Sequence, residues 1–281
     1  MPFVEFKKSI RFSSNPQNGS INLNSNGNRF TVQLNNSIAI PQSARDASIE
    51  LNNGELWNNN PNISSENKNN MLDFVYGVDS YNFVVPDGLY SLNDLNAFLT
   101  REFKKASPVL PDDLFVLVGN NSTQRVLIDF NYAGIQIDFT TSNIRTILGF
   151  DSRLSPLAPS TIGEEDIADG SAQFDRVTAW QIRMSFLSNG IPVNNQSSNT
   201  LAYIPITAGV GSLQFIEPRN PVPISLENLI GNSINNFDVE LVDQEGRDVD
   251  TLGEYWEFVV LIRYCVELGS NRNNGRLLTH H

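Results

Sequence analysis

The sequence predicts a mainly β protein, a two-sheet antiparallel sandwich that carries a small inserted α+β subdomain. Most apolar segments alternate with a period of two, which is typical of strands with one buried face. Asparagine is abundant, with 36 copies in 281 residues, and its clusters indicate exposed loops between the first strands. One block of the chain changes to helical spacing before β character returns.

Five strands are expected before or at the start of the insertion. The segment Arg29–Leu34 alternates most cleanly, whereas the polar stretch 52–70 is expected to be a loop because of its asparagines. The candidate strands are Val4–Phe12, Arg29–Leu34, Ser48–Leu51, Met71–Tyr76 and Asn82–Val85.

The inserted subdomain is expected to have its own core. Ser91 and Asp94 resemble a capping box, and Leu92, Leu95, Phe98, Leu99 and Phe103 then follow helical spacing. A strand at Phe115–Val118 and a hairpin over 126–139 come next. A short helix at Asn143–Leu148 is expected to end at Gly149. We therefore predict three parts: 1–77 and 151–281 form the sandwich, the latter opening with a connector at 151–173, and 78–150 forms the insertion.

After the connector, strands are expected at Arg176–Phe186, Leu201–Ile206 and Ser212–Ile216. The last two strands are predicted to form a closing hairpin. Phe237–Val242 alternates apolar with acidic residues, and Asp243–Gly246 supplies turn residues. Trp256, Phe258, Val260, Ile262 and Tyr264 then occupy every second position, so they are expected to line the core, whereas Val259, Leu261 and Arg263 lie on the opposite face.

Composition excludes several classes of protein. The chain has 19 Lys and Arg against 31 Asp and Glu, a formal charge of −12, which argues against a nucleic-acid partner because phosphates require cations. Lys7, Lys8 and Arg11 are interpreted as a solvated strand edge. No apolar run approaches the ~18 residues of a membrane span, and no signal peptide is apparent, so a soluble chain is expected. The single cysteine, Cys265, forms no internal disulfide.

The sequence offers no catalytic equipment. Both histidines, His280 and His281, end the chain like the start of a purification tag, so no Ser–His or Cys–His pair is expected. Cofactors and metal sites are likewise expected to be absent. The acidic clusters could attract a hard cation such as Ca²⁺, but solvated loops are the favoured interpretation. These clusters are Asp112–Asp113, Glu164–Asp166 with Asp169, and Asp243, Glu245, Asp248 and Asp250.

Several of these segments resemble one known family. Phe237–Val242, the turn Asp243–Gly246 and Trp256–Tyr264 are similar to the closing strands of the penton, or vertex, proteins of virophages and polinton-like viruses. Gly88–Leu92 and Ile147–Phe150 are similar to the inserted domain of that family. The family is related in architecture to adenovirus penton base, and the asparagine-rich composition suits a mavirus-type virophage.

The resemblance implies a single jelly roll that assembles as a homopentamer at the five-fold vertices of an icosahedral virion. It also implies contacts with the major capsid protein, an inserted domain that projects outward, and location in the virion after assembly in the host cytoplasm. A host receptor would be a further partner, through the inserted subdomain. For the subunit interface we select Trp180, Val259, Leu261 and Arg263.

Two other functions remain open at the level of sequence. The first is a jelly-roll attachment module whose asparagine-rich loops bind a carbohydrate or a receptor. The second is a glycoside-active β-sandwich enzyme that relies on carboxylates alone, although no spacing in the sequence singles out a carboxylate pair.

Overall fold

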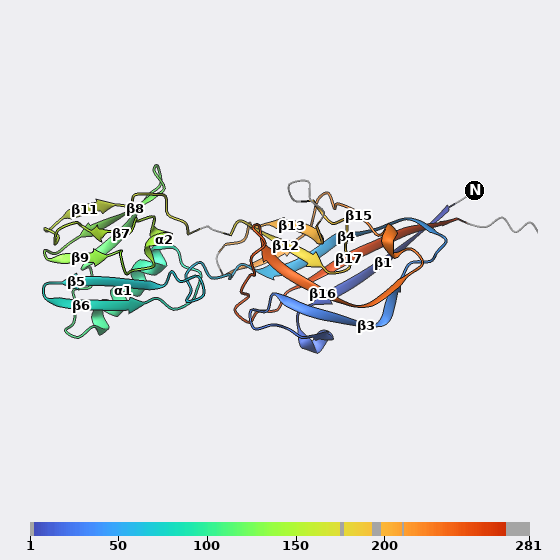
Figure 1. The fold of residues 1–281 in the computed structure, drawn as a ribbon, viewed down its shortest axis with the longest axis horizontal. Coiled ribbons are helices and arrows are strands. Elements are labelled where there is room, and N and C mark those ends of the chain that lie inside the picture. Colours follow the sequence, from blue (N-terminus) through green and yellow to red (C-terminus); the bar gives the residue numbers. More distant parts are fainter. Residues whose placement is uncertain (1–2, 175–176, 193–197, 210, 268–281) are drawn as a thin grey trace, which may run out of the picture. The chain divides into compact units, whose positions relative to one another are not determined.

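The computed structural model describes residues 3–174, 177–192, 198–209 and 211–267, so His280 and His281 lie outside the described residues. The protein is mainly β, with antiparallel sheets (Figure 1). It divides into two compact units. Unit 1 comprises 1–57, 179–207 and 213–281, and unit 2 comprises 58–178 and 208–212. Among the described residues, no helix combines the length and apolar character needed to cross a bilayer.

Unit 1 contains two antiparallel sheets. The β17 sheet has the order β1–β17–β4–β14, and β15 also pairs with β4; the β16 sheet has the order β13–β12–β16–β3–β2. The first consists of β1 (Phe3–Ser13), β17 (Glu257–Glu267), β4 (Ala44–Trp57), β14 (Leu213–Ile216) and β15 (Ile224–Ser225). The second consists of β13 (Thr200–Pro205), β12 (Ala179–Met184), β16 (Ser233–Asp243), β3 (Arg29–Ala39) and β2 (Ser20–Ile21). Two short 3-10 helices, η1 (Pro16–Asn18) and η2 (Glu227–Leu229), lie in the connections.

The two sheets of unit 1 pack face to face through aromatic side chains. The rings of Phe12 and Phe237 lie 5.4 Å apart, centroid to centroid, and those of Phe30 and Trp256 lie 5.3 Å apart. Along β17 the predicted alternation is confirmed, since Phe258, Val260 and Ile262 are buried while their neighbours are only half-buried. Each aromatic pair contains one residue on, or directly beside, a strand of the first sheet and one residue on a strand of the second sheet. The side chains between the two sheets therefore form the core of a β-sandwich.

The predicted closing hairpin is wrong, because β16 and β17 belong to different sheets. The turn itself forms, with the Gly246 amide donating to the Asp243 carbonyl at 3.0 Å. The chain then crosses to the other sheet, where the Trp256 indole donates to the Gly27 carbonyl at 2.9 Å. Both edges of β17 are already paired, one with β1 and the other with β4, which leaves no edge for β16.

Strand β4 is longer than the predicted Ser48–Leu51 and runs through Asn52, Asn53 and Gly54 to Trp57. Tertiary pairing overrides the low strand propensity of these residues. Gly54 pairs with Phe258, and a Cβ atom there would lie 2.8 Å from the Glu257 carbonyl oxygen. A glycine therefore allows the close approach of β4 and β17 at this point.

Unit 2 has two small antiparallel sheets, a long helix and a single-turn helix. One sheet has the order β10–β9–β5–β6 and the other β11–β8–β7. Their strands are β5 (Met71–Tyr76), β6 (Asp79–Val84), β7 (Phe115–Asn120), β8 (Arg125–Phe130), β9 (Ile135–Asp138), β10 (Leu154–Ser155) and β11 (Glu164–Ile167). Phe74, Phe103, Phe115 and Phe130 are fully buried in the core, where ring pairs connect Phe74 to Phe103 and Phe115.

Both predicted helices of the insertion are present. Helix α1 (Leu92–Lys105) begins at a complete capping box, in which the Ser91 hydroxyl accepts from the Asp94 amide and the Asp94 carboxylate accepts from the Ser91 amide. Helix α2 (Arg145–Leu148) ends at Gly149, which has a φ of 85° and donates its amide to the Arg145 carbonyl. Local signals are sufficient at both places.

Unit 2 is larger than the expected insertion 78–150. Strand β5 precedes residue 78, but it pairs with β6 and β9 and so lies inside the unit. The segment interpreted as a connector contains β10 and β11, which pair with β9 and β8. Strands β10 and β11 are short and have few apolar residues of their own, so they gain their place by pairing. The apolar pattern of β5 predicts a strand but not the unit in which it pairs.

Candidate assembly surface

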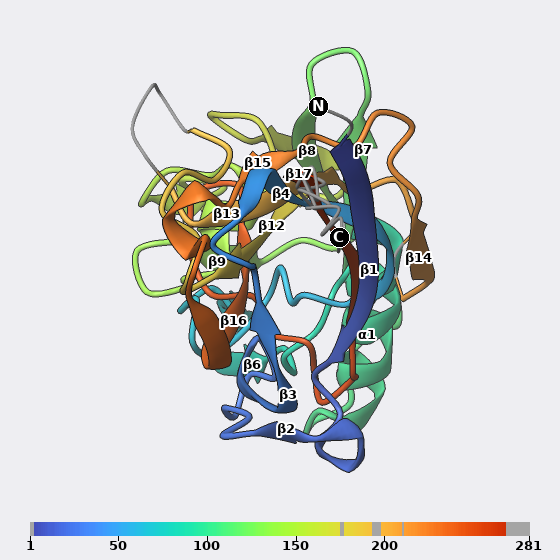
Figure 2. The same cartoon turned by 90° about the vertical axis from the view of Figure 1, so that its right-hand side faces the viewer.

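Strand β1 forms one edge of the β17 sheet and pairs only with β17 among the described residues (Figure 2). It is 11 residues long, and its register with β17 is continuous from Phe3 opposite Glu267 to Ser13 opposite Glu257. The outer edge of such a strand presents unpaired backbone N–H and C=O groups, which can accept another strand. Lys7, Lys8 and Arg11 are exposed on it, as expected.

The face of β1 that packs against the core of the sandwich also includes residues that lie past the end of this core. Because side chains alternate, Val4, Phe6 and Ile10 point to the same side as Phe12. Phe12 is 3% exposed, whereas Phe6 is 44% and Val4 37% exposed. The Phe6 ring stacks on Tyr264 of β17 with centroids 5.3 Å apart. We call the four facing residues Val4, Phe6, Tyr264 and Val266 the ribbon surface, an apolar face that the rest of unit 1 leaves partly open.

The opposite face of β17 carries the three residues selected from sequence on this strand. Val259 and Leu261 are half-buried. Arg263 forms an ion pair with the buried carboxylate of Glu50 on β4. Farther along the same face, Glu257 accepts a hydrogen bond from Arg11, which raises the pKa of that guanidinium. The structure therefore brings Val259, Leu261 and Arg263 together on one solvent-accessible face.

Trp180, the fourth selected residue, lies elsewhere. It belongs to β12, between β13 and β16, and its side chain is 1% exposed. The indole Nε1 is buried and has no hydrogen-bond partner among the described residues. The alternation of 180–186 marks the core side of a central strand, so the Trp180 ring offers no surface to a neighbouring molecule.

The ribbon surface was not selected from the sequence. Val4 and Phe6 do alternate with Ile10 and Phe12, but Lys8 interrupts the series. Alternation predicts which side of a strand a residue faces and does not predict where the opposing sheet ends. The charged residues Glu5, Lys7 and Lys8 beside them are typical of a solvated strand edge.

The acidic clusters are engaged in local structure. The Asp243 carboxylate accepts from the backbone amides of Glu245 and Arg247 and from the Arg247 side chain. Asp112 forms an ion pair with Lys104 at 2.9 Å. Within the described part of the chain, no group of three or more Asp, Glu, Cys or His side chains is arranged to hold a metal ion.

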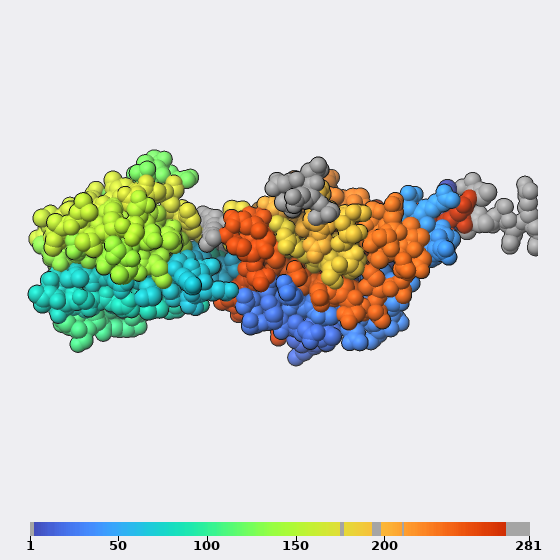
Figure 3. Space-filling view, in the orientation of Figure 1, coloured from blue at the N-terminus to red at the C-terminus, as the bar shows by residue number. Residues whose placement is uncertain are grey.

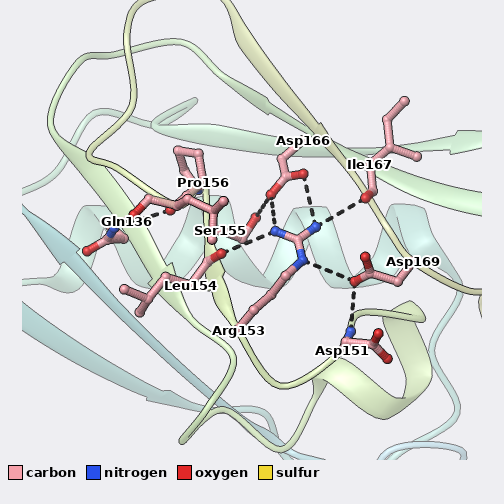
Figure 4. A network of polar contacts seen from close by, with 10 residues as sticks. Gln136, Asp151, Arg153, Leu154, Ser155, Pro156, Asp166, Ile167 and Asp169 are labelled. Atoms are coloured by element: carbon pink, nitrogen blue, oxygen red, sulfur yellow. Dashed lines mark hydrogen bonds and ion pairs between the residues drawn. The ribbon is translucent and has the colours of Figure 1, made fainter.

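A dense polar network surrounds Arg153 in unit 2 (Figure 4). Its guanidinium forms a bidentate pair with Asp166 at 2.6 and 3.0 Å and reaches Asp169 at 3.1 Å. Two further N–H groups donate to the carbonyls of Leu154 and Ile167. Ser155 donates its hydroxyl to Asp166 as well.

This network is structural. A guanidinium has five N–H donors, and all five are used here, so no donor remains for a ligand. The hydrogen bond to Asp166 is the main cause of the raised pKa of Arg153. The Asp151 amide, and then Arg153, lower the pKa of Asp169. The network ties β10 to β11 across the segment that the sequence indicated as a connector.

No protein-family model matches the chain, and no curated protein matches its sequence. Among solved structures, the chain is similar to the crystal structure of the mavirus penton protein. That likeness covers 94% of this chain and 100% of that chain, with 10% sequence identity and a TM-score of 0.45.

Proposed function

We propose that this protein is a structural capsid subunit that assembles as a homopentamer at the five-fold vertices of an icosahedral virion. The proposal assigns it no catalytic role, no cofactor and no metal. It starts from the resemblance of the closing strands and the insertion to virophage penton proteins. Three features of the fold support it independently.

The first supporting feature is the strand pairing, from which we infer a jelly roll. In chain order the eight principal strands are β1, β3, β4, β12, β13, β14, β16 and β17. The first pairs with the last, the second with the seventh, the third with the sixth and the fourth with the fifth. This nested antiparallel pairing is that of a long ribbon folded into two sheets, as in the jelly rolls of viral capsids.

The second feature is the place of unit 2 in the chain. It enters between β4 and β12, the third and fourth strands of the sandwich, and it has its own core. A separately folded insertion leaves the sandwich strands free to form lateral contacts. In the proposed assembly, unit 2 is the outward-projecting domain.

The ribbon surface is the observation that carries the proposal. A closed ring requires a heterologous interface, in which one patch of a subunit binds a different patch of the next. Val4 and Phe6 are exposed on an edge strand that can also pair through its backbone, so β1 suits one side of such an interface. The other side is proposed to include Val259, Leu261 and Arg263 of the neighbouring subunit.

Partners and location follow from the same role. The subunit would contact its own copies and the major capsid protein of the same virion, within the virion, after assembly in the host cytoplasm. Specific binding to nucleic acid is not part of the proposal, because the formal charge of −12 repels phosphates.

The test compares two matched substitutions by native mass spectrometry. Phe6→Glu introduces a charge into the ribbon surface and is expected to convert pentamers to folded monomers, with the β-sheet circular dichroism spectrum retained. Val109→Glu places the same charge at a residue of unit 2 that is 70% exposed, and the pentamer is expected to persist. Equal assembly of both variants and the parent would refute the role of β1.

A further inference from the structure

Unit 2 contains a polar cleft at the end of the β7–β8 hairpin. It has a volume of about 610 Å³, and its walls come from that hairpin, the start of α1 and the segment 172–174. The β7–β8 turn projects from the body of unit 2 (Figures 1 and 3).

The chemistry of the walls is unusual for this acidic chain. Asn121, Gln124, Gln173 and Arg125 line the cleft, and none of its described lining residues carries a carboxylate. All four side chains are exposed, and none makes a hydrogen bond or ion pair within the described part of the chain. Leu92 and Phe174 supply apolar surface in the same cleft.

The backbone around these side chains is held in place. The Asn120 side-chain oxygen accepts from the amides of Ser122 and Thr123 at 3.0 and 3.2 Å, which fixes the turn. The Ala172 amide donates to the Gln124 carbonyl at 2.8 Å and so joins the two walls directly. The Gln173 amide donates to Ile147 at 2.8 Å. Such a preformed frame reduces the entropy lost on binding.

We propose that this cleft binds an oligosaccharide that carries a carboxylate. Sugar hydroxyls both donate and accept hydrogen bonds, and an amide side chain does the same with its NH₂ and C=O groups. The apolar faces of sugar rings pack against aliphatic and aromatic side chains such as Leu92 and Phe174. Arg125 selects the carboxylate, because its guanidinium matches that planar group and has no acidic partner among the residues that the structure describes.

The proposal goes beyond the capsid role and does not depend on self-assembly. A subunit with this cleft attaches to a glycan through residues remote in sequence from the ribbon surface. If the protein formed no pentamers, the test of saccharide binding would be unaffected. If it bound no saccharide, the test of pentamer assembly would likewise be unaffected.

The experiment uses the full chain produced in a host without N-glycosylation, because Asn120 and Asn121 both begin Asn-x-Ser/Thr sequons. The protein is screened against an array of neutral and carboxylated oligosaccharides, and the affinity for the best ligand is then measured by titration calorimetry. Saturable binding to carboxylated glycans is expected. Arg125→Gln and Gln173→Ala are each expected to weaken it about tenfold, the loss that follows from one hydrogen bond to a charged or polar partner.

Asn67→Ala is the matched control. Asn67 is also an exposed amide of unit 2, but it lies outside the cleft, so its replacement is expected to leave the affinity unchanged. Three results would overturn the proposal: no saturable binding to any glycan, binding that the two cleft variants do not weaken, or equal binding of neutral and carboxylated glycans.

Discussion

At the scale of single residues, the guanidinium of Arg153 organises a segment that has little apolar surface. Its five hydrogen bonds hold two carboxylates and two carbonyls within the same part of unit 2. The Phe150 ring lies under the same guanidinium, 5.4 Å from its centre. Polar contacts here take the place that apolar packing has in the core.

Replacing Arg153 by glutamine is therefore expected to lower the free energy of unfolding by about 2–3 kcal/mol, because two partly buried carboxylates lose their cation. Arg125→Gln is the control, since Arg125 is exposed and has no partner among the described residues. Its effect should stay within about 0.5 kcal/mol. Urea unfolding measures both, and equal values would contradict the structural role of Arg153.

Asp169 gives the same network a dependence on pH. Its pKa in the folded protein is below the usual 3.8, because it accepts hydrogen bonds from the Asp151 amide and from Arg153. A lowered folded pKa adds stability above the unfolded pKa, and this stability is lost as the pH falls through the folded value. Asp169→Asn is expected to destabilise the protein at pH 7, and the difference from the parent should shrink below pH 3.8. Urea midpoints measured across this range test the prediction, and a constant difference would contradict it.

At the scale of elements, two glycines with a positive φ allow the energetic cost of backbone strain to be distinguished from the cost of a steric clash. A Cβ atom at Gly149, after α2, would lie 2.5 Å from the Gly170 carbonyl oxygen, whereas one at Gly163 would have no neighbour within 4 Å. Their φ angles are 85° and 73°. The energetic penalty for placing a residue with a Cβ atom in the left-handed conformation is thus similar at the two positions. Only at Gly149 would the Cβ atom also clash with neighbouring atoms.

Gly163→Ala is expected to cost about 1–2 kcal/mol, the strain of a left-handed residue with a Cβ atom. Gly149→Ala should cost clearly more, because the 170–171 segment must also move. The two unfolding free energies, measured in urea, decide the matter. Similar costs for the two variants would show that the contact between Gly149 and Gly170 relaxes freely.

Elements that depend on residues close in sequence could be predicted from the sequence, but the strands with which they pair could not. The Ser91–Asp94 capping box and the alternation of Phe258, Val260 and Ile262 depend on residues close in sequence, and both predictions are confirmed. The pairing of β17 with β1 and β4 joins residues more than 200 positions apart. A turn at Asp243–Gly246 followed by a strand therefore suggested a hairpin that the sheets do not form.

The same dependence on strand pairing explains which residues of the candidate assembly surface could be predicted from the sequence. The sequence predicted the exposed face of Val259, Leu261 and Arg263, because that face follows from alternation. The burial of Trp180 depends on β12 lying in the middle of its sheet. The exposure of Val4 and Phe6 depends on where the opposing sheet ends. Both are properties of strand order, which no local pattern contains.

At the scale of the whole molecule, the chain divides into two compact units, and unit 2 has a hydrophobic core of its own. The core residues of unit 2, from Ile63 to Ala168, all lie within 58–178. A polypeptide of these residues alone is expected to fold with a cooperative unfolding transition and dispersed amide resonances. A noncooperative transition or collapsed resonances would show that unit 2 depends on the sandwich.

The proposed function requires self-assembly through the β17 sheet. Images of the purified full-length protein by negative-stain electron microscopy test this claim most directly, because they report the number of subunits and their symmetry together. Closed five-fold rings are predicted, and they should be absent from Phe6→Glu. A protein that stays monomeric at high concentration, or that forms rings of another symmetry, would contradict the proposed pentamer.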